Sequence, residues 1–156
     1  MSVSQKLADR LRELFIHGKW IANTNYKALL GEIDFNLAKA KVENCNSIAA
    51  LTFHINYYLS GILKVFNGGN LDIHDQFSFD YPEIKEEQDW EHLVDSLINS
   101  AEQLILVVEN LSDTMLEKVF VDLKYGSYQR NIEGVIEHGY YHLGQMVLIK
   151  KLKNIK

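Results

Sequence analysis

The chain has 156 residues, and its 16 lysines and arginines against 21 aspartates and glutamates give a formal net charge of −5 at pH 7. This length predicts a single domain over residues 1–156. The acidic balance argues against a duplex-binding protein, whose phosphate contacts need a basic face, so we expect no nucleic-acid partner. The one cysteine, Cys45, cannot form a disulfide within the chain, which fits a reducing, cytoplasmic compartment.

The sequence pattern also argues against secretion and membrane insertion. Residues 1–15 are charged and amphipathic, so we expect no secretory signal there. No uncharged apolar run reaches the roughly 18 residues that suggest a transmembrane helix, so no membrane partner is expected. The chain has only one proline, the residue that interrupts helices most, which favours a helical protein.

Apolar residues recur at helical spacing in four long segments, which predicts an all-α four-helix bundle. Ser47 is the predicted amino-terminal cap of the second helix and Asp89 that of the third, while Asn67-Gly68-Gly69 ends the second. The expected helices cover about residues 3–16, 47–66, 90–111 and 131–152.

Long, partly structured connections join these helices. They comprise residues 17–46, with a short helix expected around 26–33, and residues 67–89 and 112–130. Aromatic residues in all three predict loops that are packed onto the bundle, and loops of this length are usually functional or disordered. Connections this long allow crossovers as well as hairpins, so the order of the helices around the bundle stays open.

The richest segment for chemistry is residues 136–145, in which His138 and His142 are one helical turn apart. Their Cβ atoms are then expected about 5–6 Å apart on one face, where two neutral imidazoles can bind one divalent metal. Gln145 shares this face and is expected to contact a ligand histidine from outside the coordination sphere. The opposing interpretation is that these are ordinary residues of an amphipathic helix.

His54, in the apolar second helix, is the candidate third ligand. A buried imidazole needs a partner, which is either a metal or a backbone carbonyl. If the second and fourth helices run parallel, the three imidazoles lie at the same level. Three histidines leave one position open for water or substrate, the pattern of a catalytic zinc site.

A mid-helix histidine followed far downstream by H-x-x-x-H and then G-Q resembles the DinB/YfiT-like superfamily. The matching segments are LTFHINYY at residues 51–58 and IEHGYYHLGQ at 136–145, supported by GKW at 18–20 and by Asp89-Trp90. The resemblance covers nearly the whole chain. It implies a four-helix bundle, often dimeric, that binds Zn²⁺ or Ni²⁺ through His54, His138 and His142.

The resemblance also implies a class of activity. Characterised members include thiol-dependent S-transferases and isomerases that use mycothiol, bacillithiol or glutathione, and many others are described as metal-dependent hydrolases. We therefore expect a metal-dependent enzyme for a small-molecule substrate, either a hydrolase or an S-transferase with a low-molecular-weight thiol. The alternative is a non-catalytic metal-binding or scaffold bundle that acts through dimerisation or a protein partner.

No catalytic residue can be named from the sequence. Glu137 points about 100° away from His138 on the helix, so we interpret it as a surface or dimer residue. His74 is a possible fourth ligand, although an exposed loop histidine is the preferred interpretation. Tyr141 precedes the last ligand and is assigned no role, and Cys45 is interpreted as an inert small residue.

Two further features of the helices that carry the histidines predict local packing. Gly139 and Gly144 each cost helix propensity, which predicts close approach by another element or a ligand. The tyrosine pairs at 57–58 and 140–141 straddle helix faces, so one member of each pair is expected to line a pocket while the other packs.

Overall fold

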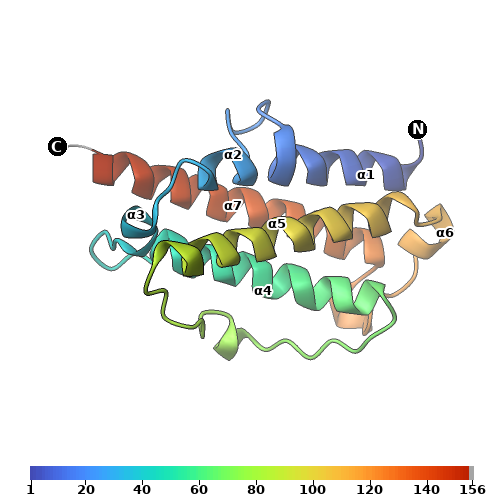
Figure 1. The fold of residues 1–156 in the computed structure, drawn as a ribbon. Coiled ribbons are helices and arrows are strands. Elements are labelled where there is room, and N and C mark those ends of the chain that lie inside the picture. The colour runs from blue at the N-terminus through green and yellow to red at the C-terminus, as the bar shows by residue number, and fades with distance from the viewer. Residues whose placement is uncertain (155–156) are drawn as a thin grey trace.

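The computed structural model describes residues 1–154, which form an all-α fold. Four long helices make a bundle, confirming the expected class (Figure 1). They are α1 (Val3–Arg12), continued by the π-helical segment η1 (Glu13–His17), α4 (Ile48–Phe66), α5 (Glu87–Glu109) and α7 (Tyr128–Asn154). Within residues 1–154, extended pairing is limited to one bridge between Val119 and Ser127.

Short helical elements fill the connections. They are α2 (Tyr26–Leu30), α3 (Phe35–Lys39), η2 (Asp75–Phe77), α6 (Asp113–Leu116) and η3 (Leu123–Tyr125). The helix expected around 26–33 is therefore shorter than predicted, because its carboxyl-terminal cap is already at Gly31.

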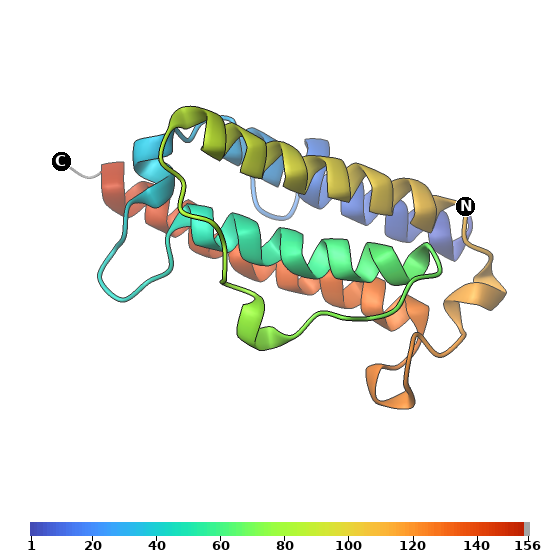
Figure 2. The ribbon, with the colours of Figure 1, turned by 60° about the horizontal axis from the view of Figure 1, so that its bottom comes forward.

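The bundle contains a crossover. α4 and α5 lie side by side and run in the same direction, opposite to α1 and α7 (Figures 1 and 2). The chain between α4 and α5, residues 67–86, therefore returns along the full length of α4, and we call it the crossover (Figure 2). α4 packs against both α5 and α7.

The helix boundaries test the predicted caps. Ser47 caps α4 as expected, because its Oγ accepts a hydrogen bond from Ala50 N at 3.1 Å. Asp89 is not the cap of α5, which begins earlier, after Glu86. Instead Asp89 occupies the third helical position of a capping box, and its carboxylate accepts from the backbone N–H groups of Lys85 and Glu86.

The core beneath the last helix explains Gly139, one of the three glycines of α7. A Cβ at Gly139 would overlap Leu14 Cδ2, and Leu14 is fully buried. The Gly139 carbonyl accepts a 2.8 Å hydrogen bond from the buried hydroxyl of Tyr26. At Gly144, apart from the adjacent residues and the backbone of α7 itself, no described atom lies within 4 Å of the position that a Cβ would take, so no other element of residues 1–154 makes the expected close approach.

Membrane insertion finds no support in the helices. Across residues 1–154, each helix is too short or too polar to span a bilayer.

Candidate metal centre

Three histidines from two helices meet in the middle of the bundle. His54 of α4 and His138 and His142 of α7 bring one ring nitrogen each within 4.8 Å of the others. The sequence placed the three imidazoles at one level on the condition that these helices run parallel, and that condition is not met, because α4 and α7 run in opposite directions (Figure 2). The imidazoles still lie at one level because α7 is long and extends past the start of α4, so that middle positions of α7 face the amino-terminal half of α4.

The three ring nitrogens are spaced nearly as they would be around one shared metal ion. His138 Nε2 lies 2.9 Å from His142 Nε2 and 3.2 Å from His54 Nε2. Two nitrogens bound to one tetrahedral Zn²⁺ at about 2.0–2.1 Å are separated by about 3.3 Å. The Nε2 atoms therefore need only small adjustments to hold one ion between them.

Hydrogen bonds on the far side of two rings determine which nitrogens face the centre. His54 Nδ1 lies 3.3 Å from the carbonyl oxygen of Ser78, and His142 Nδ1 lies 2.6 Å from Oε1 of Gln145. Both oxygens only accept, so each Nδ1 carries the proton and each Nε2 turns a lone pair inward. Such partners orient metal-binding histidines and select their tautomer.

With both Nδ1 atoms protonated, the centre holds more nitrogen lone pairs than N–H donors to satisfy them. His138 Nε2 can carry a single proton, which can satisfy His54 or His142 but not both. A cation at the centre would satisfy all three lone pairs at once. The donor set therefore fits a divalent metal better than it fits a hydrogen-bonded cluster.

The environment keeps the imidazoles neutral. Burial lowers the pKa of His138 to about 4, helped by repulsion from His142 and His54. Burial likewise lowers the pKa of His54, with a further contribution from His142, and it lowers the pKa of His142 against the opposing effect of Gln145. Metal binding requires neutral imidazoles, so the site is prepared for a cation at neutral pH.

The crossover supplies contacts that the sequence did not reveal. The Phe79 ring stacks on His54 with centroids 4.1 Å apart, and Ser78 contributes its carbonyl. Asp75 accepts a 2.6 Å hydrogen bond from the hydroxyl of Tyr58, whose ring lies steeply inclined to those of His54 and His138, with centroids 5.0 and 5.4 Å away. In the sequence, only the aromatic residues of this connection pointed to these contacts. They predicted that the loop packs onto the bundle, but not that it contacts the histidines.

The other sequence candidates lie around the centre. Gln145 contacts His142 as expected. His74 is an exposed loop residue outside the cluster, and Cys45 is also exposed. Glu137 is exposed and pairs with Arg130. Tyr141 is 64% exposed, although its ring lies 4.8 Å from that of His142.

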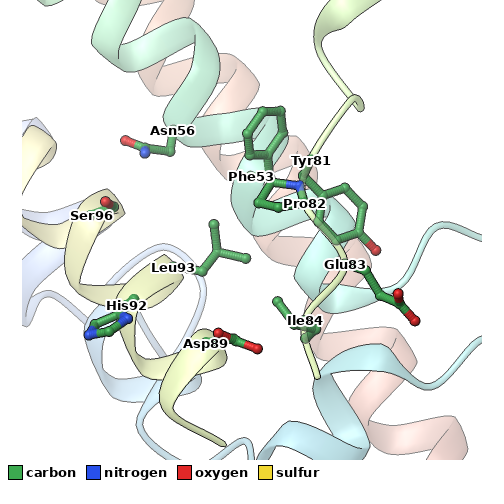
Figure 3. Close-up of a pocket in the computed structure, with 10 residues that line it drawn as sticks. All are labelled: Phe53, Asn56, Tyr81, Pro82, Glu83, Ile84, Asp89, His92, Leu93 and Ser96. Carbon is green, nitrogen blue, oxygen red and sulfur yellow. The ribbon is translucent and has the colours of Figure 1, made fainter. Parts of the chain in front are cut away.

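A groove of about 440 Å³ opens beside His138 between α4, α7 and the connection that precedes α7. Tyr58 lines it, as expected for one member of its tyrosine pair. A separate pocket of about 360 Å³ lies between α4, α5 and the end of the crossover, with walls that include Phe53, Leu93 and Pro82 (Figure 3). None of the three candidate ligands lines that second pocket.

Comparison with known proteins supports the resemblance seen in the sequence. A family model described as the DinB superfamily matches residues 22–146, which include all three histidines. No curated protein and no solved structure matches the chain.

Proposed function

The chain belongs to the DinB superfamily, and on this basis we propose that it is a metal-dependent enzyme whose divalent ion, zinc or nickel, is held by His54, His138 and His142. The observation that carries the proposal is the convergence of three Nε2 atoms, two of them oriented by acceptors on their Nδ1 side. Three imidazoles and an open position are the ligand set of catalytic rather than structural zinc.

The protein's own part in catalysis is to orient the histidine rings and to shield them from water. Ser78 and Gln145 hold the His54 and His142 rings, while Phe79 covers one face of His54. The groove beside His138 provides room for a small-molecule substrate. A bound divalent ion supplies a Lewis acid that makes a water or a low-molecular-weight thiol nucleophilic near neutral pH.

The site is compatible with both reactions, hydrolysis and thiol-dependent S-transfer. Hydrolysis by an activated water usually also employs a protein base. The carboxylate of Asp75, which accepts the hydroxyl of Tyr58 through one oxygen, is the acidic group beside His54. S-transfer would ask less of the protein, because a low-molecular-weight thiol held by a metal ion at the three histidines would not need such a base.

The test is elemental analysis of protein purified without a histidine tag or metal resin, compared with the double variant His54→Ala/His142→Ala. We expect about one metal ion per wild-type chain and none in the variant, with circular dichroism checking that the variant is helical. Absence of metal in both, with no uptake by the wild type on reconstitution, would contradict the proposal. That result would favour the non-catalytic bundle.

A further inference from the structure

The groove beside His138 carries cations that the metal chemistry does not use. We propose that this groove binds a substrate or thiol with a carboxylate at its far end, which lies against Arg130 and Lys124 while the reacting end lies at the histidines. The position of the reacting end rests on the proposed function, whereas the carboxylate site rests on the groove itself.

The groove has the size and lining of a small-molecule site. Its volume of about 440 Å³ lies within the range of about 300–1,000 Å³ typical of ligand pockets. Tyr58 and Ile62 of α4 and Val135 of α7 provide apolar surface. Arg130 and Lys124 are its cationic lining residues. Apolar walls with a few charged groups suit a ligand that has a short chain and one anion.

A glycine keeps the path from the cation to the histidine clear. Arg130, Gly134 and His138 succeed each other at intervals of four residues on α7, so they share one side of the helix and span about 12 Å. Apart from the adjacent residues and the backbone of α7 itself, no described atom lies within 4 Å of the position that a Cβ would take at Gly134. Core packing therefore does not require this glycine, which costs about 0.8–1.0 kcal/mol relative to alanine in a helix.

The connection before α7 holds Lys124 at the edge of the groove. Val119 and Ser127 pair across it, and Phe120 N donates to the carbonyl of Gly126 at 2.9 Å. Gly126 has a φ of 74°, a left-handed conformation that favours glycine at this turn. The Lys124 ammonium lies 4.8 Å from the Tyr125 ring centroid, and within residues 1–154 no carboxylate pairs with it.

The partner of Arg130 is replaceable. Its guanidinium donates to Glu137 at 3.0 Å, but the two side chains are 55% and 60% exposed. Exposed pairs of this kind contribute about 0–1 kcal/mol, and a guanidinium has five N–H donors. A ligand carboxylate can therefore share or replace Glu137. Because Glu133 also acts on Arg130 electrostatically, a singly charged carboxylate suits the site better than a doubly charged phosphate.

The test compares mercaptoalkanoates with mercaptoalkanols of equal length, from mercaptoacetate to mercaptooctanoate, by calorimetry on the zinc-loaded protein. At a length that spans the groove we expect the acid to bind about tenfold more tightly than the alcohol, as a charged hydrogen bond allows. Arg130→Gln/Lys124→Gln should remove this preference. Glu137→Gln should increase it, because that change leaves Arg130 without its competing carboxylate.

A steric variant and a metal-free measurement complete the test. Gly134→Leu should weaken both long probes by filling the groove floor, while elemental analysis shows an unchanged metal content. In metal-free protein, octanoate but not octanol should shift the amide resonances of Arg130 and Gly134. Equal binding of acid and alcohol, unchanged by the charge variants, together with no octanoate shifts would overturn the inference. Octanoate shifts in a chain that takes up no metal would keep it while the proposed function fails.

Discussion

At the scale of single residues, the candidate centre depends on the groups that hold each imidazole as much as on the imidazoles themselves. Gln145 Oε1 lies 2.6 Å from His142 Nδ1 and accepts its hydrogen bond. The backbone carbonyl of Ser78 accepts from His54 Nδ1 in the same way. Only the first of these two contacts can be removed by mutation, because the side chain of Gln145 can be truncated whereas the backbone carbonyl of Ser78 cannot.

Gln145→Ala is expected to weaken zinc binding about 10- to 100-fold, the usual cost of losing a partner of a metal-binding histidine. The measurement is competition with a chromophoric chelator. Gln145→Glu is the matched control, since its carboxylate still accepts from Nδ1 and should retain most of the affinity. Equal affinity of wild type and Gln145→Ala would show that His142 needs no such support.

The lowered histidine pKa values predict how acid affects the metal-free protein. The pKa of His138 falls from its ordinary value of 6.5 to about 4 on folding, so the unfolded chain binds the proton more readily. The stabilising contribution is complete above pH 6.5 and is lost as the pH falls towards 4. Urea unfolding of metal-free protein at several pH values should show this decline. His138→Gln should make it shallower, and an identical slope in that variant would contradict the assignment.

At the scale of elements, α7 has one face packed against the core and one face that is exposed, and two of its glycines lie on these different faces. Gly139 faces the core, where Leu14 fills the space of a Cβ, whereas Gly144 is exposed. Chemically identical changes at the two positions should therefore have opposite effects.

Gly139→Ala is expected to destabilise the protein by about 1–3 kcal/mol through overpacking against a buried leucine. Gly144→Ala should stabilise it by roughly 0.8–1.0 kcal/mol, since an exposed helical glycine only costs propensity. Chemical denaturation of both variants, at a concentration where the chain is monomeric, measures the difference. Destabilisation by Gly144→Ala under those conditions would mean that something in the chain approaches it.

At the scale of the whole molecule, an exposed apolar stripe on α7 is the place to test the expected homodimer. Tyr141, Leu148 and Leu152 are 64%, 56% and 43% exposed along this helix. We expect a dimeric mass by light scattering for the wild type and a monomeric mass for Leu148→Glu, with metal content unchanged in both. A monomeric wild type at high concentration would contradict the expectation.

Much of the fold could be predicted because amphipathic periodicity is a local property. The spacing of apolar residues was sufficient for the four long helices, and Ser47 was found as a cap from its place before an apolar run. Asp89 was misplaced because an acidic residue serves equally well as a cap or as the third residue of a capping box. In the structure the helix starts after Glu86, and the backbone N–H groups of Lys85 and Glu86 donate to the Asp89 carboxylate.

The part of the candidate centre that depends on local sequence could also be predicted. His138 and His142 share a face because of their spacing, and His54 was the candidate third ligand because a buried imidazole in an apolar helix needs a partner. Ser78 could not be found, since it acts through a carbonyl that every residue possesses. The groove beside His138 was equally hidden, because Lys124 and Arg130 come together only when the connection before α7 folds back.

The sequence by itself determined the helical class, the two histidines on one helical face and the family, because each depends on residue identity and short spacing. The tertiary structure decided that α4 and α7 run in opposite directions, that the crossover covers His54 and that cations line the groove at His138. These features depend on contacts between segments far apart in the chain. Long connections permit several helix orders, and only the packing of the whole bundle selects one of them.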